Sequence, residues 1–197
     1  MQNLKSVSIL NPLKPVIAMK KFLFALFAVV SLVLVQCGED NDYLISKGRL
    51  GDIQKDTDFA ALDRIFANDS VEKFTGGSDR IQEYRVFDPA GQALLVFVPL
   101  VENDSIKGIE LVKIFSSAYK TDKGISTASN FKDVADNYTI DKIEPSFSAA
   151  ILFVNEINAT ISLDKQDLNL GEFDMSAIRQ DQIPDLAHIK YITLWFD

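Results

Sequence analysis

The sequence contains very little cysteine and histidine, the two residue types that most often build metal centres and nucleophilic active sites. Cys37 and His188 are each the single residue of their type among 197. One cysteine excludes an intramolecular disulfide, and zinc sites need three or four ligands drawn from these types and carboxylates. A serine hydrolase needs a nucleophile, a histidine and an acid together, and no Gly-x-Ser-x-Gly motif occurs. We therefore predict no catalytic residues, no metal and no cofactor, and interpret His188 as a polar residue at a strand edge.

Positive charge is also scarce outside the amino-terminal segment. Residues 1–36 contain four lysines and no acid, which leaves 16 basic and 28 acidic residues in positions 37–197, a formal net charge of −12. A body of this charge repels phosphate backbones, so we predict no nucleic-acid partner. Direct contact with anionic lipid is disfavoured for the same reason. The acidity suits a folded domain that something else holds at a membrane.

The one long apolar run is too short to span a bilayer comfortably. Met19-Lys20-Lys21 precedes residues 22–35, fourteen residues interrupted only by Ser31. A transmembrane helix needs about 20 apolar residues, whereas a basic stretch followed by a shorter apolar run is typical of a signal peptide. We predict a signal peptide over residues 1–36, with Met19 as its working start.

The end of this run resembles a bacterial lipobox. Leu34-Val35-Gln36-Cys37 has the aliphatic residues and the cysteine, with Gln36 where a small residue is usual, and residues 19–42 resemble uncharacterised lipoproteins of the Bacteroidetes type. The resemblance implies that the Cys37 thiol takes a diacylglycerol and that the freed amine takes another acyl chain such as palmitate. Each buried methylene contributes about 0.8 kcal/mol, so several chains make a stable membrane anchor. The alternative is a short signal anchor with an incidental cysteine.

The residues after Cys37 bear on the location. Gly38 is not the aspartate that retains many lipoproteins in the inner membrane, and residues 39–42 resemble the acidic export tag of Bacteroidetes surface lipoproteins. The alternative for this run is an ordinary solvated linker. We expect an acidic tether over residues 37–42 and an outer-membrane location, periplasmic or surface-exposed.

Residues 43–197 have no linker rich in proline or glycine, and we predict one globular domain there. Two segments have helical spacing of apolar residues behind a capping hydroxyl, namely Thr57 with Phe59, Leu62 and Phe66, and Ser129 with Phe131, Val134 and Tyr138. This recurrence has two explanations. It marks two similar halves, or it reflects a pattern that amphipathic helices share by chance.

Strand signals are stronger than helix signals. Residues 81–87 and 92–98 flank Asp88-Pro89-Ala90-Gly91, a hairpin turn sequence, and further strands are expected over residues 106–115, 139–143, 148–154, 159–163 and 189–196. The predicted fold class is α+β, an antiparallel sheet with two helices packed on one face. This order of elements, with Gly48-x-x-Gly51 ahead of the first helix, resembles small envelope lipoproteins of the SmpA/OmlA and β-lactamase-inhibitor type. That resemblance implies no functional residue.

Three further features are candidates for modification or binding. Asp69-Ser70-Val71 and Asp104-Ser105-Ile106 resemble the Bacteroidetes O-glycosylation motif, with Ser70 and Ser105 as acceptors in predicted loops; the alternative is a chance match. Tyr191 and Trp195 share one face of the last predicted strand, which indicates either a sugar or peptide groove or a strand packed in the core.

The sequence therefore supports two hypotheses of function. The first is a non-enzymatic binding or accessory module, held at the membrane by its lipid anchor and acting on an unknown envelope protein. The alternative is a hydrolase or carbohydrate-active surface protein that uses carboxylates, which requires at least two acids to converge in a pocket. Neither hypothesis sets an oligomeric state.

Overall fold

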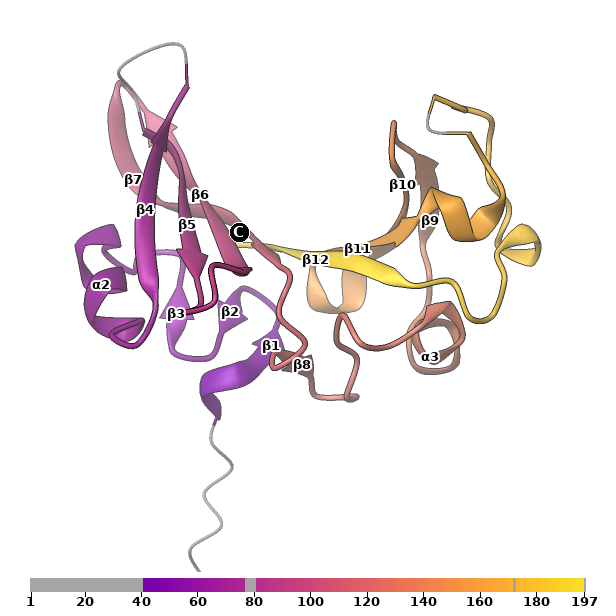
Figure 1. Ribbon diagram of the computed structural model, residues 1–197, viewed down its shortest axis with the longest axis horizontal. Coiled ribbons are helices and arrows are strands. Elements are labelled where there is room, and N and C mark those ends of the chain that lie inside the picture. The colour runs from indigo at the N-terminus through magenta and orange to yellow at the C-terminus, as the bar shows by residue number, and fades with distance from the viewer. Residues whose placement is uncertain (1–40, 77–80, 172, 197) are drawn as a thin grey trace, which may run out of the picture. The chain divides into compact units, whose positions relative to one another are not determined.

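The computed structural model describes residues 41–76, 81–171 and 173–196 (Figure 1). All described residues belong to one compact unit, Asn41–Asp197. The predicted signal peptide and Cys37 therefore lie outside the described residues.

This unit is built around an eight-stranded sheet in which every pair of neighbouring strands is antiparallel. Its strand order is β4-β5-β6-β7-β12-β11-β10-β9. The strands are β4 (Ser70–Thr75), β5 (Ile81–Phe87), β6 (Ala93–Glu102), β7 (Ser105–Ile114), β9 (Lys142–Pro145), β10 (Ala149–Val154), β11 (Ala159–Asp164) and β12 (Ile189–Trp195).

This sheet consists of two four-stranded meanders joined through their last strands, β7 and β12 (Figure 1). A helical segment precedes each meander: the 3-10 turn η2 (Phe59–Ala61) with α2 (Leu62–Ile65) in the first, and α3 (Phe131–Asn137) in the second. Phe59 and Phe131 are 72 positions apart, and the starts of β4 and β9 have the same separation. The repeated order of elements agrees with the explanation by two similar halves.

A smaller sheet of order β3-β2-β1-β8 connects the beginnings of the two halves. It contains β1 (Leu44–Ser46), β2 (Arg49–Leu50), β3 (Ile53–Gln54) and β8 (Lys120–Thr121), with β1 and β8 parallel. Gly48 and Gly51 stand in its two tight turns at φ +65° and +55°, values that glycine adopts without strain. A Cβ on Gly51 would also lie 2.2 Å from the main-chain oxygen of Asp42. Both the positive φ and this close approach therefore require glycine at position 51.

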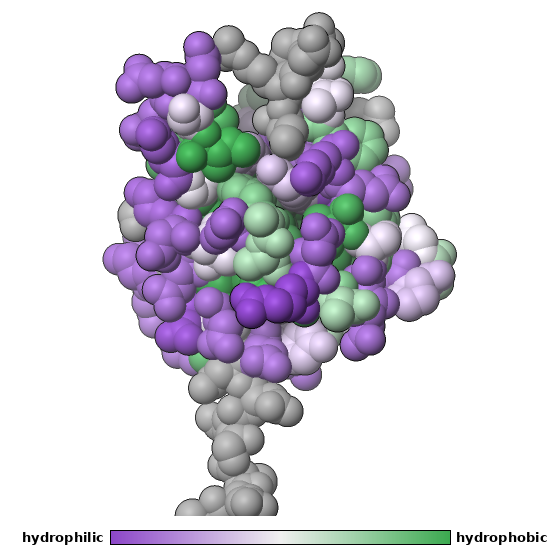
Figure 2. All heavy atoms as spheres, turned by 90° about the vertical axis from the view of Figure 1, so that its left-hand side faces the viewer, coloured by the Kyte–Doolittle hydropathy of each residue, from purple (hydrophilic) through white to green (hydrophobic). Residues whose placement is uncertain are grey.

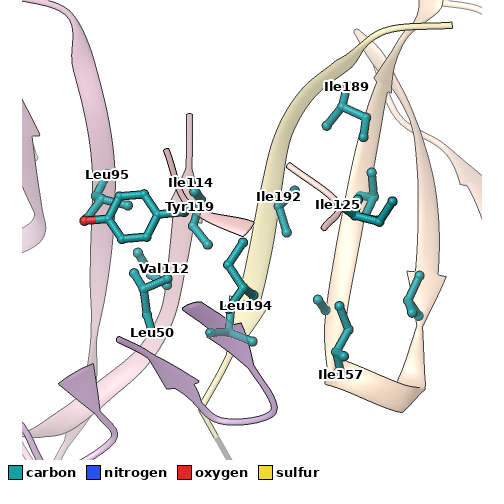
Figure 3. Close-up of a cluster of buried hydrophobic side chains, with 14 of the residues drawn as sticks. Leu50, Leu95, Val112, Ile114, Tyr119, Ile125, Ile157, Ile189, Ile192 and Leu194 are labelled. Carbon is teal, nitrogen blue, oxygen red and sulfur yellow. The ribbon is translucent and has the colours of Figure 1, made fainter. Parts of the chain in front are cut away.

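One apolar core extends across both meanders. Strand pairing places Phe97 beside Val112, Val112 beside Leu194, and Leu194 beside Ala159, and each of the four is buried. Alternate residues of a strand point to the same face, so this row continues through the sheet as a single apolar layer. Figure 3 shows Leu194 and Ile192 of β12 between the buried side chains of the first and second halves.

The predicted α+β class is wrong, because strand residues far outnumber helical residues in the described part of the chain and only α3 is a helix of more than four residues. The first expected helix is only η2 and the four-residue α2, which ends where Phe66 leaves the helical region at φ −104° and ψ +45°. The second expected helix is present as the seven-residue α3. The apolar spacing in both places needs only two turns, and it does not distinguish a short helical segment from a full helix.

The helix starts also differ from the expected ones by one residue. Asp58 caps η2 by accepting from the Ala60 N–H, and Asn130 caps α3 by accepting from the Asp133 N–H. Thr57 instead accepts from the Gln54 N–H. Aspartate and asparagine are at least as good as hydroxyl residues at this position, which explains the shift.

The predicted strands correspond to β5, β7, β10, β11 and β12 with small changes at their ends. β6 continues four residues beyond its predicted end, and β9 shares only residues 142–143 with the predicted strand over 139–143. The first hairpin turn forms as expected: the Asp88 carboxylate accepts from the N–H groups of Ala90 and Gln92, and Gly91 has φ +80°. Sequence reasoning missed β4 and the whole small sheet. The remaining short 3-10 elements are η1 (Asn41–Tyr43), η3 (Asn155–Ile157), η4 (Lys165–Leu168) and η5 (Gln180–Gln182).

Candidate binding cavity

An open cavity of about 470 Å³ lies where the small sheet meets the segment between α2 and β4 and the segment after β7. Its polar walls come from three parts of the chain that are far apart in the sequence: the start of the unit, the turn before β4, and the approach to β8. The polar and aromatic residues that line it are Asp42, Tyr43, Asp52, Phe66, Asn68, Asp69, Ser116 and Tyr119. This volume suits a small ligand or one long side chain.

Two tyrosines meet at the cavity. The rings of Tyr43 and Tyr119 have centroids 5.1 Å apart with planes at 60°, an edge-to-face contact. Tyr43 is 52% exposed and Tyr119 only 6%. Figure 3 shows Tyr119 beside Ile114, with its hydroxyl directed away from β12. The core therefore holds the ring of a residue that also lines the cavity.

The Tyr119 side chain is almost fully buried, and acidic groups act on its hydroxyl. Burial, followed by the charges of Tyr43, Asp69 and Asp42, raises the pKa of Tyr119 well above its usual value. Among the described residues, no hydrogen-bond partner for this hydroxyl is found. Every fully buried side-chain polar atom of the described residues has a partner, so the Tyr119 hydroxyl keeps some open surface and is available to a ligand in the cavity.

The cavity carboxylates differ in their pairing. Asp52 forms an ion pair with Arg49, whose guanidinium lies 3.0 Å from its carboxylate oxygen. Asp42 and Asp69 make no ion pair with any described residue. The wall is therefore net negative. The face of the unit that carries α2 and β4 is largely hydrophilic with small apolar patches (Figure 2).

Metal coordination finds no support in the part of the chain that the structure describes. No group of three or more histidine, cysteine, aspartate or glutamate residues there is arranged to hold a metal ion. The three cavity aspartates thus share a cavity without converging on one point.

The sequence-predicted modification sites lie elsewhere. Ser70 is the first residue of β4 and Ser105 the first of β7, so both stand at strand starts and not in the loops we expected. Both are exposed. Asn103 and Asp104, at φ +49° and +60°, form the two-residue hairpin turn that ends just before Ser105. Cys37 lies outside the described residues.

His188 forms a pair with Asp167. Its ring Nδ1 and its main-chain N–H lie 2.8 and 2.7 Å from the same Asp167 oxygen. The main-chain hydrogen bond, and then the one with the ring, lower the pKa of Asp167. No hydroxyl of a described residue hydrogen-bonds to His188. The pair fastens the connection between β11 and β12 directly before β12 begins.

The aromatic residues of the last strand lie on the sheet face opposite the core. Tyr191 is half-buried, with its ring 5.5 Å from that of Phe115 and 5.9 Å from the Lys113 ammonium. Trp195 is 36% exposed, while Phe196 is buried. The strand is central in the sheet, because β12 pairs with β7 and β11. A cation of the chain thus lies over the Tyr191 ring, where a sugar would have to stack.

An exposed aromatic pair marks the far end of the second meander. The Phe147 and Phe173 rings are 6.0 Å apart, edge to face, and 68% and 77% exposed. Phe147 lies in the turn between β9 and β10, and Phe173 lies in the connection between β11 and β12. These rings contact each other and remain largely open to solvent.

The architecture defines a mostly β protein with two antiparallel meanders fused into one sheet. The chain is similar in fold to the uncharacterized protein YfeY from Escherichia coli, with a TM-score of 0.50 and 10% sequence identity over 74% of this chain and 94% of that one. No family model and no curated protein sequence gave a significant match. At this identity the likeness concerns the fold alone. Within the described residues, no helix combines the length and apolarity needed to cross a bilayer.

Proposed function

We propose that this protein is a lipid-anchored envelope lipoprotein whose folded unit is a non-enzymatic binding module, with the tyrosine-lined cavity as its binding site. The observation that carries the proposal is that the candidate anchor and the first cavity residues are close in the sequence. The folded unit begins at Asn41, four residues after Cys37, and its first residues, Asp42 and Tyr43, line the cavity.

The lipid and the folded unit would divide the work between them. The acyl chains on Cys37 would supply the membrane affinity that a body of net charge −12 lacks. The unit would then present a preformed cavity to an envelope partner, periplasmic or at the cell surface of the outer membrane. Because Tyr119 and Leu50 belong to the core as well as to the cavity wall, the site is held rigidly.

The anchor is tested by replacing Cys37→Ser in the full-length protein expressed in a bacterial host that processes lipoproteins. We expect the parent to incorporate an alkyne-labelled palmitate and to sediment with membranes, and the variant to lose the label and leave the membrane fraction. Ser31→Ala, in the same apolar segment, should behave like the parent. A Cys37→Ser protein that stays as firmly membrane-bound as the parent would show that a signal anchor holds it.

The binding site is tested with a photo-crosslinking residue placed at Tyr43, which is 52% exposed at the cavity. We expect a discrete crosslinked species in cells from this position. The same residue at Leu186, which is 73% exposed and does not line the cavity, is the matched control and should give none. Equal crosslinking from both positions, or none from Tyr43, would contradict a specific site.

One observation favours the alternative, a carboxylate hydrolase: three aspartates line the same cavity. Such an enzyme needs one carboxyl that keeps its proton near neutral pH. Among the described residues, hydrogen bonds lower the pKa values of three carboxyls, those of Asp167, Asp174 and Asp181. A lowered pKa is the opposite of what the acid of such an enzyme needs. Turnover of a glycan or peptide by the purified protein, abolished by Asp69→Asn, would establish the hydrolase, and we expect no turnover.

A further inference from the structure

We infer that the cavity binds an organic cation, a primary ammonium or a guanidinium group. This inference rests on the proposed function, because it specifies the ligand of the same cavity. The observation behind it is that one cavity is lined by Asp42 and Asp69, which form no ion pair with a described residue, and by the nearly buried Tyr119, whose hydroxyl has no hydrogen-bond partner among the described residues.

The electrostatic part of the argument starts from the carboxylates. Asp42 and Asp69 both line the cavity together with Tyr119, and both charges raise the pKa of its hydroxyl. Asp52 adds a third negative group at the wall, already paired with Arg49. A net negative, partly enclosed site attracts cations and repels phosphates and carboxylates.

The tyrosines select the kind of cation. The Tyr119 hydroxyl can accept a hydrogen bond from an N–H group through its free lone pairs. Tyr43 is half-exposed and lines the cavity, so a bound cation can lie over its aromatic face. Leu50, Ile53, Ile65 and Leu94 supply apolar wall. An alkylammonium or guanidinium group has both the donors and the apolar stem that this wall accommodates.

A metal ion fits this wall poorly, since Ca²⁺ and Mg²⁺ need six or more oxygen ligands around one point. In the described part of the chain, the acidic residues form no such cluster. The volume of about 470 Å³ also exceeds what one ion needs and accommodates a lysine or arginine side chain. The cation comes either from a free small amine or from a basic side chain of a peptide, and both offer the same chemistry.

Calorimetric titration of the full-length protein in detergent micelles tests the inference. The probes are n-butylammonium as a free amine, 1-butanol as its neutral counterpart, and a pentalysine peptide. We expect butylammonium to bind with a Kd in the millimolar range and butanol at least about tenfold more weakly, a difference of roughly 1.4 kcal/mol. Binding should weaken as the salt concentration rises, because the charges are partly exposed. Pentalysine that binds far more tightly than butylammonium points to a peptide as the source, and equal affinity points to a free amine.

Variants assign the effect to the cavity. We expect Asp69→Asn and Asp42→Asn each to weaken butylammonium binding about fivefold or more, and Tyr119→Phe to weaken it by about two- to fivefold. Asp63→Asn, at an exposed position on α2 outside the cavity, is the matched control and should bind like the parent. Thermal melting of each variant checks the fold; Tyr119→Phe keeps the ring in the core and tests the hydroxyl by itself.

Three results would overturn the inference: butanol binding as well as butylammonium, Asp63→Asn weakening binding as much as Asp69→Asn, or no detectable binding of either cationic probe. Failure of this inference is distinguishable from failure of the proposed function. A Tyr43 crosslink that persists in saturating butylammonium would leave the binding module standing with another ligand. Butylammonium binding with no crosslink would leave the cation site standing without a protein partner.

Discussion

The two halves of the sheet have the same order of elements but differ in their proportions. In the first, β6 and β7 are ten residues each, and the helical segment before the meander is divided between the three-residue 3-10 turn η2 and the four-residue α2. In the second, the strands are four to seven residues long and α3 is a properly capped helix. The candidate cavity draws most of its wall from the first half. Under the proposed function, the first half would bind the ligand and the second half would stabilise the fold.

The second half uses its residues differently. A connection of 24 residues, 165–188, joins β11 to β12 and returns apolar side chains to the common core, namely Leu168, Ile178, Ile183 and Ala187. It is fastened by the buried Lys165, whose ammonium donates to the Asp174 carbonyl, and by the Asp167–His188 pair. The core nevertheless remains continuous across the β7–β12 pairing. We therefore expect the halves to unfold together.

Truncation of the core in each half gives the largest expected effect. Phe97 of β6 and Ile161 of β11 occupy equivalent strands, each next to the last strand of its meander, and both are fully buried. We expect Phe97→Ala to lower the free energy of unfolding by about 3–5 kcal/mol and Ile161→Ala by about 2–5 kcal/mol, from lost burial and the cavity left behind. Chemical denaturation followed by circular dichroism measures both values.

The same measurement tests whether the two halves are independent. One core predicts a single transition that shifts as a whole in both variants. Leu186→Ala, at an exposed position, should leave the transition within about 0.5 kcal/mol of the parent. Two separate transitions, with each variant shifting only one, would break the comparison and show two cores.

Two glycines sharpen the contrast within the first half. Gly48 and Gly51 have similar positive φ, but only at Gly51 would a Cβ collide with backbone, 2.2 Å from the Asp42 oxygen. We expect Gly51→Ala to cost about 2 kcal/mol or more, and Gly48→Ala about 1 kcal/mol from φ alone. Thermal and chemical unfolding measure the difference. Equal costs would mean that the approach of Asp42 to the turn is not needed for folding.

Much of the sheet could be predicted from the sequence, because alternating apolar residues and turn sequences such as Asp88-Pro89-Ala90-Gly91 are local signals. β4 was missed because its sequence, Ser-Val-Glu-Lys-Phe-Thr, carries charge, and its burial is slight. The small sheet was missed because its strands have only two or three residues. Segments this short cannot show the alternation of apolar and polar residues that identifies a strand. The length of the first helix depended on where Phe66 leaves helical geometry, which spacing does not encode.

The cavity could not be predicted, because its members are brought together only by the fold. Tyr43 and Tyr119 are 76 positions apart and meet through the parallel pairing of β1 with β8. Asp69 appeared in the sequence only as part of a possible glycosylation motif. The one local signal was the acidic run ending at Asp42, and that run is equally typical of a solvated linker.

Capping distinguishes the helical segments of the two halves. Asn130 and Asp133 cap α3 reciprocally, whereas Asp58 makes one hydrogen bond at the start of η2. We expect Asn130→Ala to destabilise the protein by about 1 kcal/mol and Asp58→Ala by about 0.5 kcal/mol. Asn130→Ser, which retains a cap, should recover most of the loss, and an Asp58→Ala effect larger than that of Asn130→Ala would reverse the contrast.

The smallest effect concerns the pH dependence of the long connection in the second half. The pKa of Asp167 is lowered from its ordinary value of 3.8 by the hydrogen bonds from His188. A carboxyl with a lowered folded-state pKa stabilises the protein above its ordinary pKa, and this contribution is lost as the pH falls through the folded value. We expect Asp167→Asn to cost about 0.5 kcal/mol at pH 7, with the difference from the parent shrinking as the pH falls below about 4. Denaturation midpoints across pH 2–7, with Asp63→Asn as the control, measure it. A difference that grows toward low pH would show that the pair with His188 does not stabilise the folded connection.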